Sequence, residues 1–218
     1  GVSKPDSAQV YLTYNGDFKD RLDDGWTPHQ AGGMSLEPVD RLYQGAVGSP
    51  LEGNFARLGG DDETYDEGEV PVGHAALWQS LHIPDVPNPE IVIRYRVATH
   101  DVVYGEGTDR YFDDFEVSLN QPPWELDRDD RNYAHCNEQL DVPASIYLTR
   151  AGLVFCDGNR TGDPTGTEST HDRGWQTVTL QLGPDFRGRN VKLYLANFNR
   201  VDGYWNTWTY VDEVKVDW

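Results

Sequence analysis

Hydrophobic and polar residues alternate along most of this chain, which is the pattern of half-buried antiparallel strands. The segment EIVIRYRVAT, at 90–99, shows it clearly, because Ile91, Ile93, Tyr95 and Val97 share one parity and two arginines take the other. The same alternation occurs at 9–14, 54–60, 75–84, 113–120, 174–183, 190–199 and 206–216. Turn-forming Gly, Pro, Asn and Asp separate these segments, and none has a convincing helical period. The pattern therefore predicts an all-β chain, either a sandwich or a barrel.

The stretch 121–172 interrupts this rhythm. It contains long polar runs and only two short strand candidates, at 146–148 and 153–155. Loops of such length in a compact domain are usually functional or partly disordered. We interpret the stretch as an insertion between two strands of one sheet. Because the chain shows no internal repeat and no linker rich in Ser, Thr and Pro, we expect a single domain over 1–218.

The charge of the chain is strongly acidic. Its 218 residues include 37 acidic and 18 basic side chains, for a net charge of −19. Such a field repels phosphate backbones, so we expect no nucleic-acid partner. The carboxylates either form a solvated coat or converge in part on Ca²⁺, which takes about six to eight oxygen ligands. No apolar stretch approaches the roughly 20 residues that span a bilayer, so we expect no membrane span.

The chain has two cysteines, Cys136 and Cys156. A disulfide between them would close a loop of about 20 residues and contribute roughly 3 kcal/mol in the chain-entropy model. Two free buried thiols, or a reactive thiol, are the alternatives. A disulfide would place the protein outside the cytoplasm.

Four segments carry a resemblance to a known superfamily. They are YNGDFKDRLDDGWT (14–27), GNFARLGG (53–60), GWQTVTLQLGPDFRGRNVKLYLANFN (174–199) and NTWTYVDEVKV (206–216). In this order the chain resembles galactose-binding-like and carbohydrate-binding modules of the jelly-roll type, families 4 and 22 among them. It is also similar to MAM-like domains of secreted bacterial peptidases. The resemblance implies an antiparallel β-sandwich in an extracellular or cell-surface setting, as part of a larger secreted protein.

The same resemblance implies a structural calcium site. The family commonly holds Ca²⁺ between an Asp of the last strand, here Asp212, and an N-terminal segment of the form NGxFE. Lys19 stands where the family often has Glu, so Asp17 or Asp20 would have to supply the missing oxygen, unless Lys19 ligates through its carbonyl. Two other readings stay open, a Lys19–Asp212 ion pair without metal and simple exposure of Asp212 to solvent.

Binding of a polysaccharide or glycan requires aromatic rings that stack on sugar faces, with polar side chains directed at the hydroxyls. Two clusters have this composition. The first contains Tyr104, Arg110, Tyr111 and Trp124, and the second contains Asn199, Arg200, Tyr204 and Trp205. The alternative is that these rings cap the core, and we expect Trp208 to be a core residue.

Evidence for catalysis is weaker. Asp114 and Glu116 share the polar parity of their strand and would lie roughly 7 Å apart, but such a face is more often solvated or holds a cation. No zinc, nucleophile or nucleotide-binding motif is present. We therefore predict a non-catalytic extracellular carbohydrate-binding module with a structural calcium ion. The alternatives are a protein-interaction or spacer domain of a secreted peptidase or surface protein, and a jelly-roll polysaccharide lyase or glycosidase.

Overall fold

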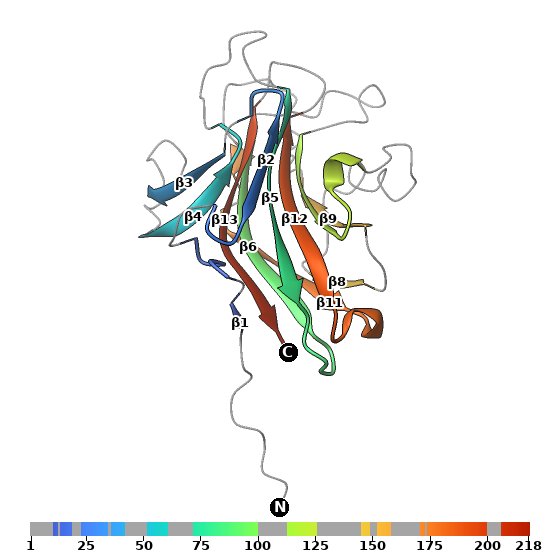
Figure 1. The fold of residues 1–218 in the computed structure, drawn as a ribbon. Coiled ribbons are helices and arrows are strands. Elements are labelled where there is room, and N and C mark those ends of the chain that lie inside the picture. Colours follow the sequence, from blue (N-terminus) through green and yellow to red (C-terminus); the bar gives the residue numbers. More distant parts are fainter. Residues whose placement is uncertain are drawn as a thin grey trace, which may run out of the picture.

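The strands of the protein form two stacked sheets in a computed structural model (Figure 1). The residues that the structure describes are 11–12, 14–18, 23–34, 36–41, 52–60, 72–99, 113–125, 145–148, 152–157, 171–172, 174–199 and 206–218.

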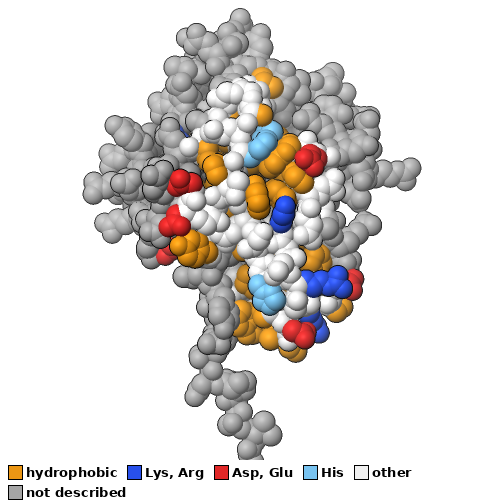
Figure 2. All heavy atoms as spheres, in the orientation of Figure 1, with side chains coloured by type: hydrophobic (Ala, Val, Ile, Leu, Met, Phe, Trp, Pro, Cys, Tyr) orange, Lys and Arg blue, Asp and Glu red, His pale blue; other side chains and the backbone are white. Residues whose placement is uncertain are grey.

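The first sheet has five strands in the order β2-β5-β12-β7-β9, all paired antiparallel. Their bounds are β2 (Thr27–Ala31), β5 (Gly73–His82), β7 (Asp114–Leu119), β9 (Gly152–Asp157) and β12 (Asn190–Asn199). The outer face of this sheet carries hydrophobic, histidine and basic side chains close together (Figure 2). It is the face on which the candidate site lies.

The second sheet has eight strands. Its main path is β3-β4-β13-β6-β11-β8, with β1 paired to β13 and β10 paired to β6. Their bounds are β1 (Tyr11–Leu12), β3 (Leu36–Arg41), β4 (Glu52–Leu58), β6 (Glu90–Thr99), β8 (Ser145–Leu148), β10 (His171–Asp172), β11 (Gln176–Leu182) and β13 (Thr207–Asp217). The pairs are antiparallel except β8 with β11, which is parallel.

Successive strands cross from one sheet to the other, as in a jelly roll. Strands β4 to β10 alternate between the two sheets, and β11, β12 and β13 do so again. The predicted jelly-roll sandwich is therefore confirmed. One detail of the prediction was wrong. The stretch 121–172 does not join two strands of one sheet, because β7 and β11 belong to different sheets and the stretch itself adds β8, β9 and β10.

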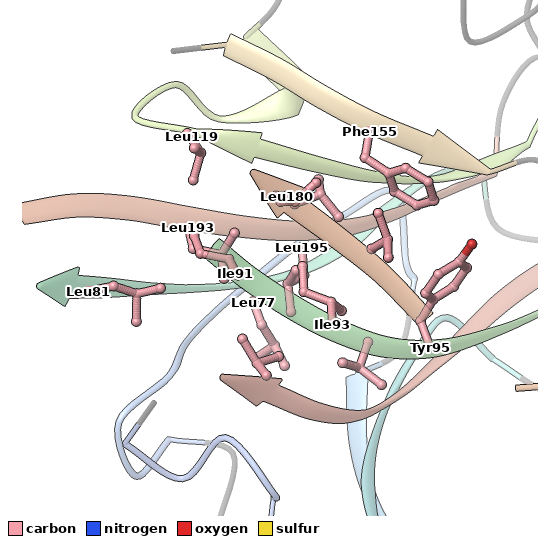
Figure 3. Close-up of a cluster of buried hydrophobic side chains, with 14 of the residues drawn as sticks. Leu77, Leu81, Ile91, Ile93, Tyr95, Leu119, Phe155, Leu180, Leu193 and Leu195 are labelled. Carbon is pink, nitrogen blue, oxygen red and sulfur yellow. The ribbon is translucent and has the colours of Figure 1, made fainter. Parts of the chain in front are cut away.

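The main hydrophobic core fills the space between the sheets (Figure 3). Ile91 and Ile93 of β6 project into it, and both are 0% exposed. Leu77 of β5 and Leu195 of β12 meet them from the other sheet. These side chains occupy the apolar parity of their strands, so the alternation in the sequence correctly identified the inward face.

Strand β13 contains a β-bulge that the alternation did not predict. The register to β6 shifts between Val211 and Glu213, so Asp212 is the extra residue. Because a bulge resets the parity, Val211 and Val214 both reach the core, and Glu213 lies on the same outer side as Asp212. Strict alternation along 206–216 would place Glu213 on the side of Val211, and the bulge places it on the opposite side.

Within the ranges given above, the structure also has two short 3-10 helices, η1 (Pro123–Glu125) and η2 (Pro184–Phe186). Within the described part of the chain, no helix is long and apolar enough to cross a membrane.

Candidate functional site

Three aromatic rings form a row across the outer face of the five-stranded sheet. Trp78 on β5 and Tyr194 on β12 are register partners, and both have the parity opposite to the core residues of their strands. Trp124 reaches the same face from η1. The Tyr194 ring centroid lies 6.0 Å from that of Trp78 and 5.8 Å from that of Trp124, with the last pair edge to face. Trp78 and Trp124 are partly exposed.

Polar groups surround this row, which we call the aromatic face. The Nζ atom of Lys192 lies 4.9 Å from the Trp78 ring centroid, and the exposed Ser80 is its register partner on β5. Burial, and secondarily the negative charge of Glu125, raise the pKa of the Tyr194 hydroxyl. That hydroxyl therefore stays protonated at neutral pH and is able to donate a hydrogen bond.

Two histidines complete the aromatic face beside Trp124. His29 on β2 and His74 on β5 are stacked against the indole, at centroid distances of 4.3 and 4.9 Å. The Nδ1 atom of His29 lies 2.9 Å from the Nε2 atom of His74. His29 is exposed, whereas His74 is buried and also contacts Phe198.

The predicted ligand residues have different positions. Trp124 belongs to the aromatic face. Asn199 is only 1% exposed, and its amide group bonds to the Asn206 side chain and the Thr207 backbone N–H. We therefore leave Asn199 out of the candidate site. The remaining candidates, Tyr104, Arg110, Tyr111, Arg200, Tyr204 and Trp205, lie outside the described residues.

Asp212 has an arginine partner that the sequence did not suggest. The Nη1 atom of Arg94 donates to its Oδ2 atom at 2.5 Å, and the carboxylate is 23% exposed. Burial raises the pKa of Asp212, Arg94 lowers it in part, and Glu213 and Asp17 raise it further. Lys19 and Asp20 lie outside the described residues, so the Lys19 pairing stays a prediction.

The N-terminal segment does lie beside β13, as the calcium prediction requires. The Val214 backbone N–H donates to the Gly16 carbonyl at 2.9 Å. Asp17 is close enough to raise the pKa of Asp212. Two carboxylates next to backbone carbonyls offer hard oxygen ligands of the kind that Ca²⁺ takes. Among the residues that the structure describes, no group of three or more His, Cys, Asp or Glu side chains is placed to hold a metal, so a calcium ion would also need carbonyl or water ligands.

Two other predictions bear on chemistry. Asp114 and Glu116 are 1% and 0% exposed, so of the two expected uses of this acidic face the solvated one is wrong, the cation-holding one stays a prediction, and the pair is not accessible to a substrate. Cys156 is buried and is not a free thiol. Cys136 lies outside the described residues, and its pairing with Cys156 stays a prediction.

Neither a protein-family model nor a curated protein sequence matches the chain. Among solved structures, the carbohydrate-binding module TmCBM61 in complex with beta-1,4-galactotriose is similar over 96% of this chain and 98% of its own, with 8% identity and a TM-score of 0.43. The K1 cleaved adhesin domain of Lys-gingipain from Porphyromonas gingivalis W83 is similar over 96% and 97%, with 12% identity and a TM-score of 0.46.

The enzymatically active domain of tailspike protein 4 from bacteriophage CBA120 is similar over 93% of this chain and 20% of its own, with 9% identity and a TM-score of 0.39. Carbohydrate-binding modules and adhesin domains are thus among the structural neighbours. Of these two classes, carbohydrate-binding modules are the one that the sequence resembles. Similarity at this level concerns the fold, and it carries no conclusion about ligand or activity.

Four residues of the aromatic face were not predicted from the sequence: Trp78, Tyr194, His29 and His74. A signal for the first two was present. Both are aromatic residues on the polar parity of central strands, where a solvated face would carry small or charged side chains. The histidines had no such signal, because their proximity depends on the pairing of β2 with β5 and on the return of the chain through η1.

Proposed function

We propose that the protein is a non-catalytic carbohydrate-binding module whose aromatic face binds a neutral glycan. The observation that carries the proposal is the row of Trp78, Tyr194 and Trp124 on the outer face of the five-stranded sheet. Aromatic rings on a sheet face offer apolar surface for the C–H faces of sugars, and nearby polar groups can bond their hydroxyls. In this proposal the exposed Lys192 supplies such a bond, and Tyr194, which is only 5% exposed, supports the two indoles from between them.

The charge of the protein indicates which glycans to test. A net charge of −19 repels polysaccharides rich in carboxylate or sulfate groups, so neutral oligosaccharides are the better candidates. The ammonium group of Lys192 covers part of the Trp78 indole. A bound sugar would take its place on the ring, and the exposed lysine would turn to bond a hydroxyl.

We further propose that Asp212 and Asp17 contribute to a structural Ca²⁺ site, with Asp20 as a third carboxylate. Three observations support this site. The Val214 backbone N–H bonds to the Gly16 carbonyl, and the charge of Asp17 is near enough to raise the pKa of Asp212. That pKa stays raised although Arg94 is bonded to the carboxylate. A divalent cation would offset the remaining cost of that buried charge.

The setting that fits these properties is extracellular or at a cell surface, as part of a larger secreted protein. A buried Cys156 that is not a free thiol supports an oxidising compartment. A protein-interaction or spacer role is the main alternative.

The test is binding of neutral oligosaccharides, measured by titration calorimetry and by quenching of tryptophan fluorescence. We expect dissociation constants of about 10 μM to 1 mM, which is weak binding at a single site. Trp78→Ala should weaken binding at least about tenfold, because the central stacking surface is lost. Trp175→Ala is the matched control, since Trp175 is equally a partly exposed tryptophan but packs with Phe55 of the other sheet.

Three outcomes would contradict the proposal. Binding lost equally in the two variants would place the sugar elsewhere. No binding by any oligosaccharide would favour the protein-interaction or spacer role. Cleavage of the oligosaccharides, detected as new reducing ends or unsaturated products, would favour a lyase or glycosidase.

A further inference from the structure

Three rings from three separate elements lie almost parallel at one end of the aromatic face. The planes of His29 and His74 differ by 9°, and the Trp124 plane differs from them by 3° and 7°. The indole is thus stacked on both imidazoles at once. His29 comes from the edge strand β2, His74 from β5 and Trp124 from η1.

The two imidazoles lie edge to edge and share a hydrogen bond. Their facing nitrogens are 2.9 Å apart and their centroids 5.0 Å apart. Such a contact requires that one facing nitrogen carries a proton and donates it to the lone pair of the other. Among the described residues, no third His, Cys, Asp or Glu joins the two histidines in a possible metal site. A hydrogen bond therefore accounts for the contact.

We propose that the His29–His74 pair positions Trp124 for ligand stacking and makes that position dependent on pH. This inference rests on the proposed function for its ligand, but the coupling between the pair and Trp124 stands without it. Edge to edge, the two rings form one flat surface about the size of an indole. Without the hydrogen bond the exposed His29 ring is free to turn out of the plane of His74, and Trp124 loses that part of the surface on which it stacks.

Protonation acts on this hydrogen bond directly. Histidine is the side chain that ordinarily gains charge between pH 5 and 8. One added proton keeps the N–H···N contact, strengthens it, and places a cation against the indole. A second added proton puts N–H groups on both facing nitrogens and two positive charges at hydrogen-bond distance. The pair must then open.

Charged groups from several elements lie around the pair among the described residues. Glu125 follows Trp124 on η1, and Asp114 on β7 is the register partner of Phe198, whose ring lies 5.4 Å from that of His74. Lys192 on β12 lies farther along the face, over Trp78. Glu116 on β7 is the register partner of Ala196, which belongs to the cluster that Trp124 packs against. None of these groups removes the conflict between two facing N–H groups.

The first experiment uses the ligand-free protein. The indole N–H resonance of Trp124, identified by its loss in Trp124→Phe, is followed by NMR from pH 8 to pH 4.5 together with the ring nitrogens of labelled histidine. We expect the indole resonance to move with the titration of His29 and His74. His29→Gln should reduce that movement, because glutamine can bond His74 without titrating and only His74 is then left to gain a proton.

His82→Gln is the matched control. His82 is an exposed histidine at the far end of β5, where it bonds to Asn190. This variant should leave the pH response of Trp124 unchanged. A Trp124 resonance that ignores the histidine titration, or that moves equally in His29→Gln, overturns the proposal.

The second experiment measures affinity for whichever oligosaccharide binds in the Trp78 test. Between pH 7.5 and pH 5 we expect the affinity of the unaltered protein to fall about tenfold, and that of His29→Gln to change less than twofold. An affinity that does not vary with pH overturns the proposal. If no oligosaccharide binds at any pH, the proposed function fails, and the NMR experiment still decides whether the pair controls Trp124.

Discussion

Asp212 shows how one bulge residue determines local electrostatics. The bulge directs Asp212 and Glu213 to the same side of β13, where both approach Arg94. Arg94 is bonded to Asp212 and Lys215 is paired with Glu213, yet burial, together with the charges of Glu213 and Asp17, keeps the pKa of Asp212 raised. The charged form of Asp212 is therefore a net cost in the folded protein when no cation is bound.

This cost predicts an unusual dependence of stability on pH. Burial raises the pKa of Asp212 in the folded state, above the unfolded value of about 3.9. The folded state then holds this proton more tightly than the unfolded state, so the contribution of Asp212 to stability falls as pH rises through that window. In the presence of a chelator, the free energy of unfolding of the unaltered protein should rise relative to that of Asp212→Asn when the pH is lowered from 7 to 3.5.

The measurement is urea unfolding of both proteins at each pH, which cancels the effects of all other groups. Asp85→Asn, at an exposed aspartate, is the control and should show no such trend. If the unaltered protein instead becomes more stable than Asp212→Asn as the pH rises, the effect of Arg94 on the pKa of Asp212 outweighs the effect of burial.

At the scale of elements, β10 depends on one ion pair. It has only two residues, His171 and Asp172, and it pairs with the end of β6. Arg96 Nε donates to both carboxylate oxygens of Asp172, at 2.9 and 2.7 Å, and its Nη2 atom also donates. Gly174 N–H donates to the same carboxylate at 2.7 Å. The two side chains are 5% and 3% exposed.

Removal of one partner should therefore be severe. Asp172→Ala leaves the Arg96 charge buried, and we expect it to lower the free energy of unfolding by about 3–5 kcal/mol, measured in urea. Glu213→Ala is the comparison, because it breaks the more exposed pair with Lys215 and should cost about 0–1 kcal/mol. Equal losses would show that the Arg96–Asp172 pair is not effectively desolvated.

A double variant separates charge from packing. Arg96→Met with Asp172→Leu replaces both charges by apolar groups of similar size, and it should recover most of the stability lost in Asp172→Ala. Failure to recover would mean that the geometry of the pair, rather than its charge balance, holds β10 against β6.

The central strands could be predicted from the sequence, and so could the edge strands β8 and β9, which contain the candidates 146–148 and 153–155. The edge strands β2 and β3 could not. The predicted segments 90–99 and 190–199 coincide with β6 and β12, because both faces of a central strand impose a clear alternation. Strand β2 was missed because it is exposed along its whole length. It also contains Pro28, and β3 contains Pro38, as edge strands tolerate. The only sign of the Asp212 bulge in the sequence is the spacing of the apolar residues 211, 214 and 216, which breaks the alternation once.

The site was harder to predict than the fold. Trp124 was identified from its chemistry, but its neighbours were sought along the chain, whereas in the structure they come from β2, β5 and β12. Asn199 shows the converse. A polar residue at the end of a strand had the composition of a ligand contact, yet its hydrogen bonds hold β12 to β13. Composition alone does not distinguish these two uses of a polar side chain.

At the scale of the whole molecule, the two ends of the described chain meet on β13. Strand β1 pairs with its second half, and the Gly16 carbonyl bonds to Val214. A cation held between Asp17 and Asp212 would join the N-terminal segment to the last strand. Because the unfolded chain cannot present these oxygens together, such an ion would stabilise the folded state alone.

Calcium should consequently raise the melting temperature. At a concentration of about 100 times its dissociation constant, an ion that binds only the folded protein adds about 2.7 kcal/mol. For a domain of this size that corresponds to roughly 5–10 °C. We expect EDTA to lower the melting temperature and Ca²⁺ to restore it.

The net charge of −19 requires a control for non-specific screening, because any divalent cation reduces repulsion among so many carboxylates. Mg²⁺ at equal ionic strength provides it, since Mg²⁺ sheds its water reluctantly and should reproduce little of the effect. Asp212→Asn should lose the specific response, and Asp85→Asn should keep it. If EDTA leaves the unaltered protein unchanged, the calcium proposal fails, and Arg94 and the predicted Lys19 are left as the partners of Asp212. The resemblance to carbohydrate-binding modules then extends to the fold but not to the calcium site.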